Sequence, residues 1–146
     1  MNRKKFFLSE FYNMKLQELL NTGEGVSIAI VPDGIENDRE WNVYVVNTKN
    51  EEIKNVMITS NGYGEINNKK MQTSTLRWYF EKMPASSFAM VEPIMEEVFG
   101  LSNEYWVSYF ANNVLYDKKF IFLPESIQEG NLVTIPVIQK KGILIK

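Results

Sequence analysis

The side chains best suited to chemistry in this sequence are carboxylates and lysines, because histidine and cysteine are both absent. Without a thiolate or an imidazole there is no Cys nucleophile, no Cys- or His-ligated metal and no Ser-His-Asp triad. No side chain that is present has an ordinary pKa near neutrality. Acid–base catalysis would need a carboxylate or lysine whose pKa is shifted by burial and neighbouring charges. The composition therefore predicts no catalytic residue, no cofactor and no metal.

The densest acidic group contains Glu92, Glu96, Glu97 and, further along, Glu104. Such oxygen ligands bind Ca²⁺ when acids and carbonyl donors alternate around a glycine, a spacing that this group does not have. Pro93, followed by Gly100, predicts one or two helical turns over Ile94–Phe99. On a helix, Glu96 and Glu97 diverge by about 100°. We therefore expect these glutamates to form a solvated face.

A carboxylate-dependent small-ligand enzyme is the alternative function for the same residues. Paired carboxylates can hydrolyse a glycosidic bond when a fixed distance separates them in a cleft. Glu92, Glu96 or Glu104 would supply that chemistry here. The feature that distinguishes this alternative is a concave pocket in which carboxyl groups converge.

The segment from Asn61 to Glu65 has two closely spaced glycines, which can bring backbone amides near a phosphate. It lacks the glycine spacing of a dinucleotide site and the Gly-Lys-Ser/Thr ending of a P-loop. We expect a turn whose Tyr63 is exposed or packed against a sheet. A loop that contacts a ligand through Tyr63 is the alternative.

A candidate binding face comes from the segment Thr73–Phe80, where polar and apolar residues alternate. In an extended strand, Thr75, Arg77 and Tyr79 share one side, opposite Leu76, Trp78 and Phe80. Tyrosine and arginine are common in interaction hot spots. Together with Tyr44 or Tyr109, this side would present an aromatic and guanidinium surface to a partner. The alternative is the solvated side of a sheet.

Most of the chain consists of short apolar segments separated by turn residues, which is typical of an antiparallel all-β domain. The predicted strands include Val26–Val31, Trp41–Asn47, Asn55–Ser60, Thr73–Phe80, a short strand around Met90, Tyr105–Ala111 and Val114–Leu123. The last two form a hairpin at Asn112-Asn113, because asparagine tolerates left-handed backbone conformations. Pro136 predicts an edge strand or a tail near the end.

These segments predict a β-sandwich, with an antiparallel barrel as the alternative. Helical segments are too few and too short for the crossovers of a parallel α/β fold. Tyr105, followed by Val107, matches the tyrosine near the start of a late strand in immunoglobulin-like domains. Residues 1–24 are expected to form a helix and a linker, because apolar residues recur there at helical spacing. Residues 25–146 are expected to form a single domain.

A family resemblance is carried by motifs spread over about residues 41–146: Trp41-Asn42-x-Tyr44, Ser60-x-Gly62-Tyr63, Thr73-Ser74-Thr75-x-Arg77, Glu81-Lys82-x-Pro84-Ala85-x-Ser87-Phe88-Ala89, Asn103-Glu104-Tyr105, Lys118-Lys119-Phe120-x-Phe122 and Ile135-Pro136. This succession resembles a family of small uncharacterised bacterial proteins, some of which carry the label phenylalanyl-tRNA synthetase alpha subunit. The resemblance implies a shared fold and brings no site residues. The label suggests an association with tRNA or RNA. However, the chain has no arginine after Arg77, so the arginine-ended second motif of such a synthetase is missing.

The charge balance bears on the partners. The 16 basic and 18 acidic residues give a formal net charge of −2, which argues against attraction to nucleic acid or to an anionic membrane. No apolar run approaches the roughly 18–20 residues that cross a bilayer. We expect a cytoplasmic protein, because cysteine is absent and the first residues lack the apolar stretch of a secretory signal. The predicted function is non-catalytic binding of a protein partner, or self-association.

Overall fold

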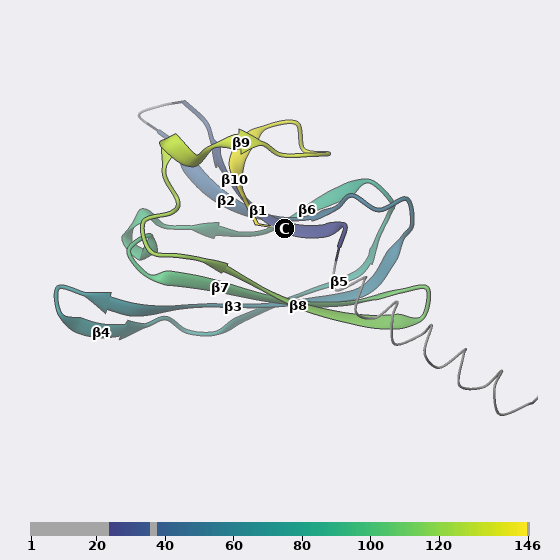
Figure 1. The fold of residues 1–146 in the computed structure, drawn as a ribbon, viewed down its shortest axis with the longest axis horizontal. Helices are drawn as coiled ribbons and strands as arrows, with labels where there is room; N and C mark the ends of the chain where they lie inside the picture. Colours follow the sequence, from purple (N-terminus) through teal and green to yellow (C-terminus); the bar gives the residue numbers. More distant parts are fainter. Residues whose placement is uncertain (1–23, 36–37, 146) are drawn as a thin grey trace, which may run out of the picture.

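Two antiparallel sheets, packed in two layers, make up the structure (Figure 1). The computed structural model describes residues 24–35 and 38–145. Sheet A has the strand order β6 (Ser87–Ile94), β2 (Glu40–Asn47), β1 (Val26–Asp33), β10 (Lys141–Ile145) and β9 (Val133–Thr134). Sheet B has the order β4 (Lys69–Gln72), β3 (Ile53–Ile66), β7 (Ser102–Ala111) and β8 (Val114–Phe122), and β5 (Leu76–Met83) also pairs with β3.

The mainly β prediction is confirmed, and all eight strand pairings within the described residues are antiparallel. The described residues form two separate sheets, so the alternative of a closed barrel is wrong. Helical structure in this part of the chain is limited to two single 3-10 turns, η1 (Glu96–Val98) and η2 (Glu129–Asn131). None of the described helices is long and apolar enough to span a bilayer.

The core lies between the sheets and takes alternate side chains from the central strands β1, β2, β3 and β7. Ile28 and Val43 of sheet A and Ile58 and Val107 of sheet B are fully buried in one apolar cluster. This follows from the period of two along a strand, which directs alternate residues to one face. Burying a side chain of this size stabilises the fold by about 1.5–3 kcal/mol.

Sheet A is covered on its other face as well. Ala29, Val31 and Val46 form a second buried cluster with Ile135, which lies in the segment between β9 and β10. Because β1 is buried on both faces, its sequence from Val26 to Val31 is almost continuously apolar instead of alternating.

β3 is longer than expected. The sequence predicted a strand at Asn55–Ser60 and a turn at Asn61–Glu65, but β3 continues through that segment to Ile66, so the predicted turn is wrong. Strand pairing keeps this segment extended, because Gly62 lies opposite Asn103 of β7 and Tyr63 lies between Ser102 of β7 and Gln72 of β4. Two neighbouring strands thus hold the glycine-containing segment extended.

The helix expected over Ile94–Phe99 is also largely wrong. β6 extends through Pro93 to Ile94, and only the three residues of η1 follow. Proline is tolerated because β6 is the edge strand of sheet A, where a missing N–H breaks no ladder. Glu92 therefore lies in a strand and not at the start of a helix.

The helix predicted within residues 1–24 falls almost wholly on residues 1–23, which lie outside the described part of the chain. The division into this segment and one domain over residues 25–146 stays a prediction.

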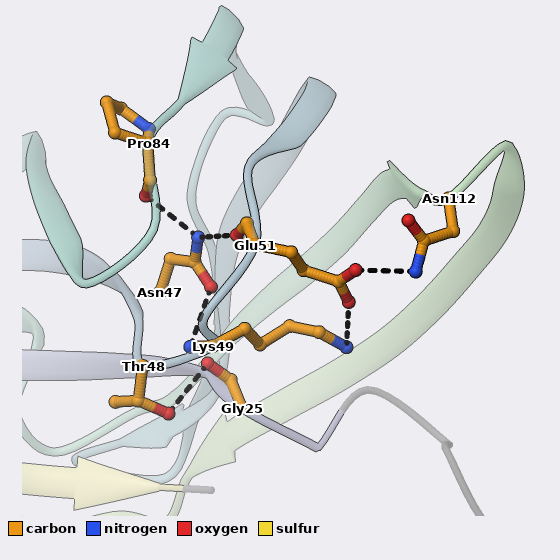
Figure 2. A network of polar contacts seen from close by, with 7 residues as sticks. All are labelled: Gly25, Asn47, Thr48, Lys49, Glu51, Pro84 and Asn112. Atoms are coloured by element: carbon orange, nitrogen blue, oxygen red, sulfur yellow. Dashed lines mark hydrogen bonds and ion pairs between the residues drawn. The ribbon is translucent and has the colours of Figure 1, made fainter.

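A polar network joins the loops at the end of the sheets where β2 ends (Figure 2). The buried Asn47 uses its whole amide group: Nδ2 donates to the carbonyls of Glu51 and Pro84 at 3.0 and 2.9 Å, and Oδ1 accepts from the Lys49 amide at 3.1 Å. The Glu51 carboxylate then pairs with Lys49 Nζ at 3.5 Å and accepts from Asn112 Nδ2 at 2.5 Å. Loops of both sheets are thereby tied together.

The hairpin predicted at Asn112-Asn113 is confirmed. These residues connect β7 to β8 with φ angles of 50° and 62°. Asn67 and Asn68, between β3 and β4, repeat the arrangement with φ angles of 53° and 63°. Positive φ at both central residues is the geometry of the tight turns that match strand twist.

We predict that Asn113→Val lowers the free energy of unfolding by about 1–2 kcal/mol, because a β-branched residue is strained in the left-handed region. Urea unfolding followed by circular dichroism measures this loss. Asn113→Gly is the matched control and should retain stability, since glycine adopts positive φ without steric cost. Equal stability of the two variants would contradict the prediction.

Candidate functional site

The predicted binding residues lie on or beside the outer face of sheet B. Trp78 and Phe80 point toward the core, so Arg77 and Tyr79 point outward from β5. Tyr63 is exposed on the same face further along β3, and Thr75 is exposed just before β5. The predicted strand face is therefore present, and Tyr63 belongs to it.

Rows of side chains cross this face. One row runs from Tyr79 through Met57 to Ser108, and the next runs from Arg77 through Thr59 to Trp106 and Lys119. The exposed fractions of Tyr79, Met57 and Trp106 are 57%, 48% and 43%. Tyr79 Oη donates a hydrogen bond to Asn55 Oδ1 at 2.6 Å, which fixes the ring across β3.

The aromatic neighbours suggested from the sequence are wrong. Tyr44 lies on the outer face of the other sheet, where its ring contacts Phe88, and Tyr109 is fully buried in the core. The residues that complete the surface are Met57, Trp106, Phe110 and Leu115. Trp106 and Phe110 were missed because β7 has aromatic residues on both of its faces, so alternation does not show which set is outside.

A second candidate site lies between the sheets and is centred on Glu92 of β6. Its carboxylate accepts hydrogen bonds from Tyr105 Oη at 2.9 Å, from Ser60 Oγ at 3.2 Å and from Trp78 Nε1 at 3.3 Å. The three donors come from β7, β3 and β5, all in the opposite sheet. The carboxylate thus accepts a hydrogen bond from each of three strands of the other layer.

A β-bulge explains why Glu92 points inward. Val43 of β2 pairs with Glu92 and the next residue, Tyr44, pairs with Met90, so Val91 is the extra residue. Val91 and Glu92 are consecutive, yet both are buried, with exposed fractions of 5% and 8%. Bulges of this kind redirect a side chain without ending the strand.

The carboxyl group of Glu92 borders a cavity of about 230 Å³. Ser60, Gly62, Asn103 and Tyr105 are buried and line its inner part. Burial raises the pKa of the Tyr105 hydroxyl well above its ordinary value, and the charge of Glu92 and their hydrogen bond add to this effect. Tyr105 is therefore a neutral donor at any physiological pH.

The other glutamates of the acidic group lie elsewhere. Glu96 and Glu97 are exposed on η1, as expected of a solvated face, whereas Glu92 contradicts that expectation by being buried. Glu104 points out of sheet B and pairs with Lys119 Nζ at 3.4 Å. These side chains do not converge in one cleft. Within residues 24–35 and 38–145, no three acidic side chains come together in an arrangement that could hold a metal ion.

Asp33 forms a third polar cluster, at the end of β1. Its Oδ2 accepts from Asn42 Nδ2 at 2.7 Å and from Tyr44 Oη at 3.0 Å, and its Oδ1 pairs with Lys140 Nζ at 2.9 Å. Partial burial acts to raise the pKa of Asp33, but the hydrogen bonds from Asn42, Lys140 and Tyr44 outweigh it and hold the pKa below its ordinary value of 3.8. The cluster connects β1, β2 and the residue that precedes β10.

A scan of protein-family models finds no match to this chain, and a search of curated proteins finds none either. The resemblance to small bacterial proteins and the synthetase label therefore stay predictions.

Two buried tyrosines of β7 allow a matched test of the Glu92 cluster. We predict that Tyr105→Phe destabilises the fold by about 1.5–3 kcal/mol, because a buried carboxylate oxygen loses a hydroxyl donor. Tyr109→Phe is the control, since its buried hydroxyl has no hydrogen-bond partner among the described residues. Burial, together with the charges of Tyr116 and Glu51, raises the pKa of Tyr109 to about 12, so this hydroxyl too is neutral.

Chemical unfolding of both variants measures the difference. The control should lie within about 0.5 kcal/mol of wild type or above it, because removing an unsatisfied buried hydroxyl is nearly neutral. Equal losses for Tyr105→Phe and Tyr109→Phe would contradict the role assigned to the Glu92 cluster.

The Asp33 cluster predicts a pH dependence of stability. Because the pKa of Asp33 is lower in the folded chain than in the unfolded one, its ionised form stabilises the fold above the unfolded pKa of about 4. That contribution is lost as the pH falls through the folded pKa. Asp33→Asn should therefore be less stable than wild type at pH 7, with a difference that shrinks as the pH falls below the unfolded pKa of about 4.

Urea unfolding at several pH values tests this expectation. Asp117→Asn is the control, because Asp117 is exposed and has no ion pair among the described residues. A difference between Asp33→Asn and wild type that stays constant with pH would count against the assignment.

Proposed function

We propose that this protein is a non-catalytic β-sandwich that binds a protein partner through the outer face of sheet B. One observation carries the proposal: side chains of neighbouring strands form rows across that face, and in these rows Tyr79, Met57 and Trp106 are exposed side by side with Arg77. Large exposed apolar patches in soluble proteins mark interaction sites. Tyrosine, tryptophan and arginine are the residue types most enriched in interface hot spots.

The contrast between the two sheets supports this choice of face. The apolar outer residues of β1 in sheet A are covered by the chain itself, through Ile135 and its neighbours. No described segment packs in the same way over Met57 and Trp106, which keep nearly half of their surface exposed. Burial of these two side chains by a partner would remove apolar area from water and so favour association.

The charges on this face favour a protein over RNA. An RNA platform surrounds its aromatic residues with cations. Here the cation Lys119 is paired with Glu104, and the acidic residues Glu81 and Asp117 are exposed on β5 and β8. Interspersed charges of both signs suit a polar rim around an apolar centre. An association with RNA, as the synthetase label suggests, is the first alternative.

A carboxylate-dependent small-ligand enzyme is the second alternative, and Glu92 in its cavity is the observation that favours it. It would have to act with a single carboxylate, because Glu96 and Glu104 lie outside that cavity. The immunoglobulin-like assignment and a cytoplasmic location also stay predictions. The Tyr105 hydroxyl donates to a side chain, whereas a tyrosine corner donates to the backbone.

The test compares matched pairs of substitutions on the two outer faces. Arg77→Ala/Tyr79→Ala changes sheet B, and Phe88→Ala/Met90→Ala removes similarly exposed apolar residues from sheet A. Light scattering first establishes whether the protein self-associates. Partners captured with wild type are then purified and titrated against all three proteins.

We expect roughly tenfold or weaker binding by Arg77→Ala/Tyr79→Ala, as for hot-spot residues, and binding within about twofold of wild type by the sheet A variant. Dissociation of a wild-type dimer by the sheet B variant alone would identify a second copy as the partner. Equal binding by all three proteins would remove this face from consideration. Salt-sensitive retention of RNA in a filter assay would support the RNA alternative instead.

A further inference from the structure

The cavity beside Glu92 has a buried inner part and an exposed rim. Glu92, Ser60 and Asn103 have exposed fractions of 8%, 6% and 5% and lie inside. Leu76 and Met95 are exposed by 48% and 61% and lie at the rim. A small molecule entering from solvent would therefore pass apolar side chains before it reaches the carboxylate.

The polar atoms available inside are acceptors. Both carboxylate oxygens of Glu92 accept hydrogen bonds, three in all. Both amide hydrogens of Asn103 are used, because Nδ2 donates to the carbonyls of Val98 at 2.9 Å and Leu101 at 3.2 Å. Its Oδ1 is turned toward Gly62, only 3.2 Å from where a Cβ at that glycine would lie.

The charge inside the cavity is also uncompensated. Among the described residues that line it, none is a lysine or an arginine, and no ion pair of the described residues includes Glu92. Buried charges are ordinarily paired with an opposite charge, because burial removes the water that would stabilise them. A cation at this place would gain both the attraction of the carboxylate and donor bonds to the acceptors.

We propose that the cavity binds the primary alkylammonium group of a small molecule. The ammonium would donate to the carboxylate of Glu92 and to Oδ1 of Asn103, while a short alkyl chain contacts Leu76, Ile94 and Met95. The volume of about 230 Å³ suits such a group, since sites for drug-sized ligands span roughly 300–1,000 Å³. A divalent metal fits less well, because it takes several oxygen ligands and only one carboxylate lines the cavity.

This site lies between the sheets and does not depend on the outer face of sheet B. It can be tested on the isolated full chain with n-butylammonium as the probe. Isothermal titration measures affinity, and amide chemical shifts in NMR spectra locate the binding. n-Butanol is the neutral probe of the same length, and tetramethylammonium is a cation without N–H donors.

For wild type we expect n-butylammonium to bind with a dissociation constant on the order of 1 mM, as its few heavy atoms allow. Its binding should shift the amides of Ser60, Glu92 and Asn103. n-Butanol and tetramethylammonium should each bind at least about tenfold more weakly, because one lacks the charge and the other lacks the donors.

Two substitutions test the residues. Glu92→Gln removes the charge at nearly constant volume and should weaken n-butylammonium binding about tenfold or more. Ser74→Phe places a ring at the exposed rim and should block entry. Glu52→Gln is the matched control, since this exposed glutamate lies outside the cavity and should leave affinity unchanged.

NMR spectra show which variants keep the fold, and if Glu92→Gln does not, the three probes on wild type and on Ser74→Phe decide. Equal affinity for n-butylammonium and n-butanol would show an apolar cavity and overturn the proposal. Shifts confined to surface residues, no binding at about ten times the expected dissociation constant, or unchanged binding by folded Ser74→Phe would each overturn it as well.

Discussion

The burial of one carboxylate constrains much of this structure. Among the described residues, Glu92 is the only charged one that is buried, and its charge is stabilised by hydrogen bonds from Ser60, Trp78 and Tyr105. These donors belong to three strands of the opposite sheet, so the register of each strand must be correct for the set to form. Leaving such a charge without donors would cost several kcal/mol, which disfavours alternative packings of the sheets. The Glu92 cluster therefore links the two layers through directional hydrogen bonds as well as through apolar burial.

The outer faces of the two sheets differ in how far their apolar side chains are exposed to solvent. The segment around Ile135 covers the middle of sheet A and makes β1 fully interior, whereas sheet B keeps Trp106, Met57 and Tyr79 in contact with water. A sheet that is apolar on both faces needs a cover on each of them. The two proposed binding sites therefore lie in different parts of the molecule. A partner protein would contact the outer face of sheet B, while a small cation would enter the cavity between the sheets.

The ends of the sheets are fixed by asparagines with two distinct roles. Asn67, Asn68, Asn112 and Asn113 adopt the positive φ angles that tight hairpin turns require. Asn47 instead remains buried and uses its amide as a bridge between loops (Figure 2). The turns depend on local backbone preference, which is visible in the sequence. The bridge depends on loops far apart in sequence, such as those containing Glu51 and Pro84, and could not be foreseen from it.

The amino-acid sequence was enough to predict the all-β class, the central strands and the hairpin at Asn112-Asn113, because alternation and turn preference act within a few residues. It also identified the side of β5 that carries Arg77 and Tyr79. Three features required the folded chain: the segment around Tyr63 is strand, Pro93 lies in an edge strand, and a bulge at Val91 turns Glu92 inward. Pairing between strands that are distant in sequence sets these features. The residues next to Glu92 in the sequence do not show that three hydrogen-bond donors from the other sheet will reach its carboxylate.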